Sequence, residues 1–504
     1  MPLPRCLAVL LWTLLPLLAA AQAHPRLLFD SADIPELRTK IQREPFASMY
    51  QELLALKDMR DDDQYGPSYA AVRNAFLYVL SGDPVYADDA LAYVDETLAL
   101  SGWADDSWKA LGRAMLGKGV AFAYDFCYDA WSPADRDRVS LALKENGDSL
   151  MRAGGGGWPG DSATANNWHG VRYSGAILCY KASDEAGTGI SNAYDGLRTH
   201  LVAKYGTGPE ARGWDVEGIG YVRYPWGSFI GAAGIVLQRL EGIDMIADAP
   251  GAGYALWAMW PGVLPLPSYH NAFDEPILGL HPDFSDDNPN FIGEGSHGLS
   301  FYYSPDGYEP GLRWMYDRIG GSLGDQTWDH YRHGTIYSIL YYPDDVPAEN
   351  PEDVWGLYYE DERHGMVLFR DRYQDANDLV TQFNAKQLRP SNTHAGADLN
   401  GFRIFGLGTA WATGSGRTGR MGGQTTVFKG EPGSARGDDS TGQLLTYFYQ
   451  GDGSGYADIA GSSTGVSGHV RRLVTDYSGA SGARGVWVIS DRTEDGTLWR
   501  LNTD

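Results

Sequence analysis

The first two thirds of the chain carry apolar residues at helical spacing. Between about Ala32 and Gly320, apolar side chains recur every three or four positions, as in the segment Ala70–Leu80. Gly, Pro, Asn and Asp separate these runs at intervals typical of helix hairpins. The pattern predicts a helical N-terminal domain. Helix hairpins without a sequence repeat fit an incomplete (α/α) toroid, but periodicity alone does not distinguish a toroid from another helical array.

The pattern changes after about Tyr337. Short runs rich in β-branched and aromatic residues, such as Leu379–Phe383 and Val486–Ile489, are separated by Gly, Ser and Asp clusters. Such runs are typical of an antiparallel β-sandwich. We therefore expect an α+β multidomain chain, with the toroid over residues 24–335 and the sandwich over residues 345–504.

The N-terminus has the pattern of a secretory signal peptide. One positive charge at Arg5 precedes an apolar run, Cys6–Ala21, and the small-x-small sequence that ends at Ala23. We expect residues 1–23 to be removed and the protein to be secreted or periplasmic. The run is short for a transmembrane helix, and no later stretch reaches about 20 apolar residues, so no membrane span is expected.

The charge of the chain limits its partners. The formal net charge is −25, which argues against nucleic acid, because binding to phosphates needs a basic face. A polyanionic substrate is not excluded, since a cleft can carry a local field of opposite sign. Five basic residues lie close in sequence to the polar segments described next: Arg172, Arg212, Arg223, Lys386 and Arg389.

Cys127 and Cys179 remain after the signal peptide is removed, and both lie in apolar, helix-like contexts. A disulfide and two buried free thiols are both compatible with these contexts. The cysteines do not have the spacing of a metal finger.

Three polar segments stand out as candidate sites. The first, residues 166–170, places Asn166, Asn167 and His169 within one helical turn, with Trp168 between them. Alone it is typical of a helix start, because Asn is a common cap.

The second and third segments add acid–base and basic groups. Residues 214–226 contain Glu217, Tyr221, Arg223 and Tyr224, and residues 383–405 contain Lys386, Arg389, His394 and Asp398. The third segment is a polar loop that runs into a strand, and such loops on a rigid scaffold often carry function.

Together the three segments resemble the heparinase II/III-type polysaccharide lyases, which include alginate lyases of the same architecture. The sequence His24–Phe29 is similar to the mature N-terminus of that family, and residues 166–170 resemble its Asn/His motif. Tyr221 and Tyr224 follow Asn167 and His169 by 52 to 57 residues, similar to the spacing of the family's catalytic tyrosine. The resemblance covers nearly the whole chain.

Two departures from the family matter. Many members read His-x-His-x-Asp where this chain has His394, Gly396 and Asp398, so one zinc ligand is missing, and a second falls near Thr413. A structural zinc needs His, Cys or carboxylate ligands, so we expect no metal ion, no cofactor, and an ordinary strand histidine at His469. The chain also stops soon after Ile489, where the family's sandwich continues, which leaves open whether the sandwich is complete.

The resemblance implies β-elimination on a polymer with 4-linked uronic acid, such as a glycosaminoglycan, alginate or a related polysaccharide. Removing the weakly acidic C5 proton requires neutralisation of the uronate carboxylate, a base, and an acid for the departing O4. Asn167 and His394 are expected to bind the carboxylate, and Tyr221 to act as base, acid or both. His169 would assist as a second base or charge stabiliser, and Tyr224 is the reserve for Tyr221.

A tyrosine base needs a cationic neighbour, which Arg223 is expected to provide. Tyr447 or Tyr449 is a candidate second acid from the β domain. The expected substrate-binding residues are Asn166, Trp168, Glu217, Arg223, Tyr224, Lys386, Arg389 and Tyr449.

Three alternatives stay open at this point. A glycoside hydrolase would use paired carboxylates from Asp215, Glu217 and Asp398. A uronate epimerase would begin with the same proton abstraction and leave no double bond. A secreted carbohydrate-binding protein would bind the polymer without turnover.

Overall fold

The computed structural model describes most of the chain beyond the expected signal peptide. The described residues are 23–60, 65–100, 103, 111–152, 164–184, 188–270, 276–287, 290–291, 295–319, 334–388, 394, 396, 398–414, 416, 424–429, 441–461, 465–495 and 497–503. The expected signal peptide, except for Ala23, lies outside them. Among the described residues, no helix has both the length and the apolar character needed to cross a bilayer.

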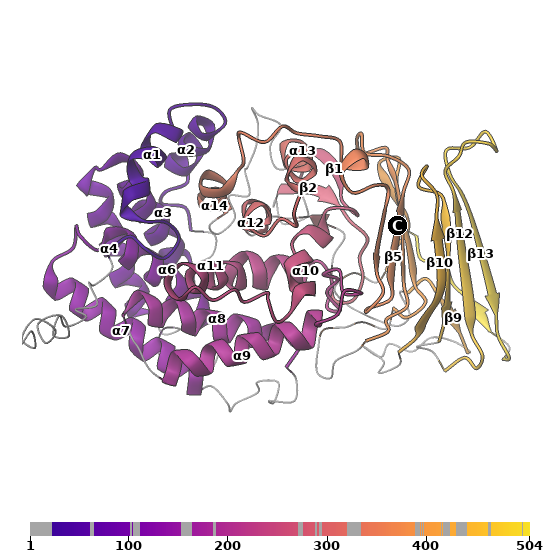
Figure 1. The fold of residues 1–504 in the computed structure, drawn as a ribbon, viewed down its shortest axis with the longest axis horizontal. Helices are drawn as coiled ribbons and strands as arrows, with labels where there is room; N and C mark the ends of the chain where they lie inside the picture. The colour runs from indigo at the N-terminus through magenta and orange to yellow at the C-terminus, as the bar shows by residue number, and fades with distance from the viewer. Residues whose placement is uncertain are drawn as a thin grey trace, which may run out of the picture.

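The N-terminal part of the molecule is built from paired helices (Figure 1). The α-helices are α1 Ile34–Lys40, α2 Phe46–Ala55, α3 Gly66–Ser81, α4 Pro84–Ala99, α6 Leu111–Cys127, α7 Pro133–Arg152, α8 Asn167–Ala182, α9 Thr188–Tyr205, α10 Gly220–Val222, α11 Gly231–Glu241, α12 Ser296–Tyr302, α13 Glu309–Ile319, α14 Gly334–Tyr341 and α15 Pro351–Val354. A π-helix, η2, spans Arg223–Ile230 and joins α10 to α11.

The helices alternate between an inner and an outer layer. α3, α6 and α8 are buried along nearly their whole length, whereas α4 and α7 bury only one stripe of side chains. A helix that is apolar on all sides is a core helix, and an amphipathic one covers it. The inner helices approach closely at small residues: a Cβ at Gly175 would lie 2.7 Å from the Cβ of Ala114. This two-layer arrangement confirms the expected toroid.

The C-terminal part is an antiparallel β-sandwich, as expected. One sheet has the order β4-β5-β6-β7-β8 and the other β10-β11-β12-β13. The strands are β4 Tyr358–Asp361, β5 Met366–Arg370, β6 Leu379–Asn384, β7 Phe402–Gly406, β8 Thr409–Ala412, β10 Gln443–Tyr449, β11 Gly455–Ala460, β12 Val470–Asp476 and β13 Val486–Arg492. A separate pair joins β9 Val427–Phe428 to β14 Leu498–Trp499. The last helix, α15, ends at Val354, so the change from helices to strands falls between Val354 and Tyr358.

The first sheet is the middle layer of the molecule. Every residue of β5, β6 and β7 is buried. One face, with Phe383 and Phe402, packs on Ile459 and Leu473 of the second sheet. The other face belongs to the core of the helical part, and Figure 1 shows the sheet between the helices and the outer sheet. Burial on both faces explains why these strands read as continuous apolar runs.

One sheet was not expected from the sequence. β1 Leu264–His270, β2 Pro276–Leu280 and β3 Asn290–Phe291 form a three-stranded sheet inside the helical half. The expectation of helices throughout residues 32–320 is therefore wrong for this stretch, where Pro265 and Pro267 lack the backbone donors that a helix interior needs. The segment between β2 and β3 carries Asp286.

The segment that begins at His24 ties the chain to an inner helix. Asp125 of α6 is fully buried, and its carboxylate accepts hydrogen bonds from the backbone of Arg26 and Leu27. His24 Nδ1 lies 2.6 Å from the same carboxylate, and its ring stacks on Tyr128. The polar groups of the segment therefore bind Asp125, and the side chains of Leu27 and Phe29 are buried in the core.

The two cysteines are buried free thiols, so the disulfide alternative is wrong. Burial raises the pKa of Cys179 to about 12 and that of Cys127 well above its ordinary value. Since the thiolate is the reactive species, we expect neither thiol to react with a bulky disulfide reagent at pH 8 in the folded protein. Both should react after unfolding in guanidinium, and rapid labelling of the folded protein would contradict this burial.

Candidate functional site

The motif at residues 166–170 begins helix α8. Asn166 is the N-cap, and its side chain accepts a hydrogen bond from the backbone N–H of Trp168 at 3.0 Å. The cap satisfies one of the backbone N–H groups that have no partner within the helix, so Asn166 stabilises the start of α8. Asn167 is fully buried and His169 is 4% exposed, with its ring tilted against Tyr173. Trp168 is half-buried.

Glu217 connects the first motif to the third. One carboxylate oxygen, Oε2, accepts from the backbone N–H of Asn167 at 3.1 Å and from Lys204 Nζ at 2.6 Å. The other, Oε1, accepts from Asn167 Nδ2 at 3.4 Å and from the backbone N–H of His394 at 2.9 Å. Glu217 is fully buried. Both carboxylate oxygens are therefore occupied by donors inside the protein.

Tyr221 and His394 meet at a shared carboxylate. The Tyr221 hydroxyl donates to Asp286 Oδ2 at 2.9 Å, and His394 Nδ1 lies 3.0 Å from the same oxygen. The two rings stack, with centroids 4.5 Å apart and planes 18° from parallel. A carboxylate can only accept, so Nδ1 carries a proton, and in the neutral ring Nε2 is the basic nitrogen. The His394 side chain is 33% exposed and Tyr221 is half-buried, whereas the Asp286 side chain is only 10% exposed.

The guanidinium of Arg223, the expected cationic neighbour of Tyr221, forms an ion pair with a carboxylate. It is buried and lies 3.6 Å from Asp287 Oδ1. Asp287 also accepts from the backbone N–H of Gly220 at 2.8 Å. The Tyr221 hydroxyl donates to Asp286, so the structure presents this hydroxyl as a hydrogen-bond donor.

The tyrosine segment has unusual helical geometry. Tyr221 lies in the short helix α10, and the π-helix η2 begins two residues later at Arg223. π-helical turns are rare and frequently occur at functional sites. Tyr224, the reserve candidate, lies inside η2 with its ring edge-on to Phe229. Its surroundings therefore differ from those of Tyr221, whose ring stacks on His394.

The remaining basic candidates have structural partners or lie outside the described residues. Lys386 is 4% exposed, and its Nζ donates to the backbone carbonyl of Gly396, so it holds the loop that carries His394. Arg389 lies outside the described residues. Arg172 donates to the backbone carbonyls of Leu150 and Met151.

The two tyrosines of the outer sheet have partners of their own. Tyr447 donates to Glu362 at 2.8 Å, and Tyr449 stacks on Tyr358 with centroids 3.4 Å apart. Burial, followed by the Glu362 hydrogen bond, raises the pKa of Tyr447. These contacts hold both tyrosines against β4 and the turn that follows it, whereas Tyr221 and His394 meet at Asp286.

The expected site residues do not form a metal centre. His469 Nε2 lies 2.8 Å from Asp491, and its Nδ1 lies 3.2 Å from Asn400 Nδ2. Thr413 lies in the sandwich, where its backbone N–H donates to Asn502. Among the described residues, no group of three or more His, Cys, Asp or Glu side chains is placed to hold a metal ion.

Sequence reasoning missed Asp286. It lies 65 residues after Tyr221 and 108 before His394, in the loop between β2 and β3. The neighbouring Ser285 has a positive φ of 64° and is held by hydrogen bonds from its N–H to Asp398 and from its hydroxyl to the Val216 carbonyl. A non-glycine residue in this conformation often marks a functional site. The acidic pair at 286–287 was the only signal in the sequence.

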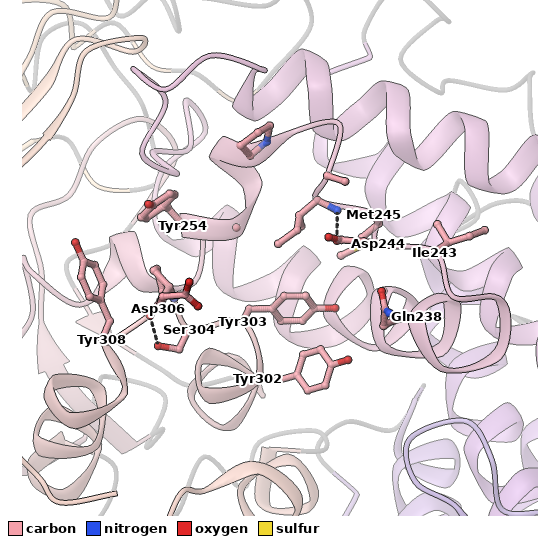
Figure 2. Close-up of a pocket in the computed structure, with 16 residues that line it drawn as sticks. Gln238, Ile243, Asp244, Met245, Tyr254, Tyr302, Tyr303, Ser304, Asp306 and Tyr308 are labelled. Carbon is pink, nitrogen blue, oxygen red and sulfur yellow. Dashed lines mark hydrogen bonds between the residues drawn. The ribbon is translucent and has the colours of Figure 1, made fainter.

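A cavity of about 780 Å³ lies apart from these residues (Figure 2). It is lined by the end of α11 and by the loop after α12, and it includes Tyr254, Tyr302, Tyr308, Asp244 and Asp306. Its lining contains no residue of the three polar segments. The candidate site is therefore defined by the converging side chains of Tyr221, Asp286 and His394, not by this cavity.

Comparison with known proteins identifies the fold. No family model matches this sequence, and no curated protein matches it. The structure of heparinase III matches with a TM-score of 0.52 and 12% identity, over 84% of this chain and 62% of that one. The chain thus spans less than two thirds of the length of heparinase III.

Two further structures match at TM-scores below 0.5. Heparan sulfate lyase HepC from Pedobacter heparinus matches at 13% identity and a TM-score of 0.44, over 88% of this chain and 71% of that one. A mutant chondroitin AC lyase from Streptomyces coelicolor A3 matches at 13% identity and a TM-score of 0.46, over 88% and 72%. With the helical toroid, the β-sandwich and the heparinase III match together, this chain has a heparinase-like polysaccharide lyase fold.

Proposed function

We propose that this chain is a secreted polysaccharide lyase that cleaves a polymer containing 4-linked uronic acid by β-elimination. In this proposal the toroid and the sandwich are two domains, and the reaction takes place where Tyr221 meets His394. The observation that carries it is the shared acceptor: Asp286 Oδ2 receives hydrogen bonds from both Tyr221 and His394.

The shared carboxylate suggests a division of labour between base and acid. Asp286 fixes the tautomer of His394, so that Nε2 can take the C5 proton, and the same carboxylate stabilises the imidazolium that forms. The electron pair of the C5–H bond becomes the C4=C5 double bond, and the C4–O4 bond breaks. Tyr221 gives its proton to the departing O4. Proton transfer from the imidazolium to the phenolate then restores both groups.

Asn167 is the proposed ligand of the uronate carboxylate. One N–H of its side-chain amide donates to Glu217, and in the proposal the second N–H points to the substrate. Hydrogen-bond donors aimed at a carboxylate stabilise the charge that develops as the C5 proton leaves. His169 stays a candidate for supporting this charge.

The hydrolase alternative fits the geometry less well. Its candidate acids Asp215, Glu217 and Asp398 are at most 1% exposed. Asp215 and Glu217 form ion pairs with Lys204 at 2.9 and 2.6 Å, and Asp398 accepts from the backbone of Ser285 at 2.7 Å. Paired catalytic carboxylates must flank a sugar bond, and these three are occupied inside the protein.

The proposal is tested with a panel of uronic acid polymers: heparan-type and chondroitin-type glycosaminoglycans, alginate, and algal uronates. Elimination creates a 4,5-unsaturated uronate, so we expect one or more polymers to generate its ultraviolet absorbance together with new reducing ends. New reducing ends without that absorbance would indicate hydrolysis. Exchange of the C5 proton with solvent without chain cleavage would indicate epimerisation, and binding without turnover a binding protein. Each of these three results contradicts the proposal.

A further inference from the structure

A buried polar network joins the helical half of the molecule to the sandwich behind the candidate site. Its centre is Glu217, whose carboxylate accepts from both backbone and side chain of Asn167 in the helical half and from the backbone N–H of His394 in the sandwich half. A single side chain thus contacts the proposed carboxylate ligand and the residue proposed as the base. These two groups belong to different layers of the fold and lie far apart along the chain.

The charge of Glu217 is balanced inside the protein. Lys204 of α9 is 1% exposed and lies 2.6 Å from Glu217 and 2.9 Å from Asp215. Burial alone would lower the pKa of Lys204, but the two carboxylates outweigh burial and raise it, so the ammonium stays charged. A buried charge without such compensation would be strongly destabilising. Asp215 also accepts from the Tyr205 hydroxyl at 2.9 Å, which fixes the far side of the network.

A second connection crosses the same boundary. His364, in the turn between β4 and β5, lies 3.0 Å through Nε2 from the Lys204 carbonyl and 2.9 Å through Nδ1 from Asp361. Asp361 in turn accepts from the backbone N–H groups of Arg212 and Trp214. The backbone carbonyl of Lys204 therefore contacts His364 of the sandwich. Its side-chain ammonium contacts Asp215 and Glu217, which lie within residues 214–226. The side chains of Lys204, Asp215, Glu217, Asp361 and His364 are at most 1% exposed, and such buried networks specify one arrangement of the groups they join.

We infer that Glu217 is a positioning residue that sets the distance and orientation between Asn167 and His394, with Lys204 as its counter-ion. The inference rests on the proposed function, in which Asn167 holds the substrate and His394 takes its proton. Catalytic groups must be held within a fraction of an ångström of the productive geometry by the residues behind them. A carboxylate is suited to this place, because these neighbours are all donors and each oxygen accepts two of them.

Two variants separate positioning from stability. Glu217→Gln replaces one oxygen by an NH₂ group, which faces donors, while Lys204 keeps Asp215 as its counter-ion. Asp215→Asn is the matched control, since it also removes one carboxylate from Lys204 but leaves the acceptor of Asn167 and His394 in place. We expect both variants to fold with similarly lowered melting temperatures. Only Glu217→Gln should lower kcat, by about 10- to 100-fold, with KM changed by less than about threefold. Equal losses of kcat in both variants, or full kcat in Glu217→Gln, would overturn the inference.

A second measurement does not depend on activity. The backbone N–H of His394 donates to Glu217, so hydrogen exchange in the peptide that contains His394 reports this contact directly. In the full-length protein we expect faster exchange in Glu217→Gln than in Asp215→Asn or the unmodified chain. If no uronic acid polymer is cleaved, the proposed function fails while this measurement still decides the inference. Unchanged exchange in Glu217→Gln would overturn the positioning role whatever the activity.

Discussion

Replacing Tyr221 by phenylalanine is expected to lower kcat for elimination by about 10³-fold, with KM changed only slightly, because loss of general acid catalysis typically has effects of about 10²- to 10⁴-fold. The substitution removes the proton proposed for O4 and one hydrogen bond to Asp286. The ring that stacks on His394 stays in place, so the fold should be preserved. Steady-state kinetics on the best polymer of the panel, with circular dichroism as a check of folding, measure this.

Tyr224→Phe is the control for Tyr221. Tyr224 lies in the π-helix with its ring against Phe229, so we expect close to full activity. If Tyr224→Phe were inactive and Tyr221→Phe active, the assignment of the acid would be reversed. Full activity in both variants would rule out a tyrosine mechanism.

Asp286→Asn is expected to lower kcat by about 10²- to 10⁴-fold, because the amide can no longer hold the His394 tautomer or stabilise the imidazolium. The NH₂ group of asparagine must also face one of two donors, the Tyr221 hydroxyl or His394 Nδ1. Steady-state kinetics on the best polymer of the panel, with circular dichroism as a check of folding, measure this loss.

The neighbouring carboxylate provides the matched control. Asp287 accepts from the Gly220 backbone and pairs with Arg223, whereas the Tyr221 hydroxyl and His394 Nδ1 bond to Asp286. Asp287→Asn should therefore lower the melting temperature but leave kcat within a few-fold of the unmodified chain. An Asp286→Asn variant with the kcat of the unmodified chain would contradict the shared-carboxylate mechanism.

Part of the site could be predicted from the sequence because its groups sit in local motifs. Asn166 caps α8, and Tyr221 and His394 lie in segments whose order and spacing along the chain are informative by themselves. The roles were less predictable. Arg223 is two residues from Tyr221, and on a helix positions two apart do not share a face. Its guanidinium accordingly pairs with Asp287, and the Tyr221 hydroxyl meets Asp286 from a distant loop.

The role of Glu217 could not be predicted from the sequence either. The sequence indicated a group near the substrate, but a sequence motif does not show whether its carboxylate faces solvent or the protein interior. Only the packing of α9 places Lys204 beside it, and only the chain segment between β6 and β7 brings the His394 backbone to it. Burial and partners are tertiary properties, and they turn an expected ligand into a positioning residue.

The sequence by itself determined a helical half followed by a β-rich half and the three segments that carry the candidate chemistry, because periodicity, caps and motifs are local. The tertiary structure decided the β1–β3 sheet, the free thiols, the partner of Tyr221 and the link between Asn167 and His394. These depend on contacts between groups up to 177 residues apart, which are set by how the layers pack rather than by neighbouring residues.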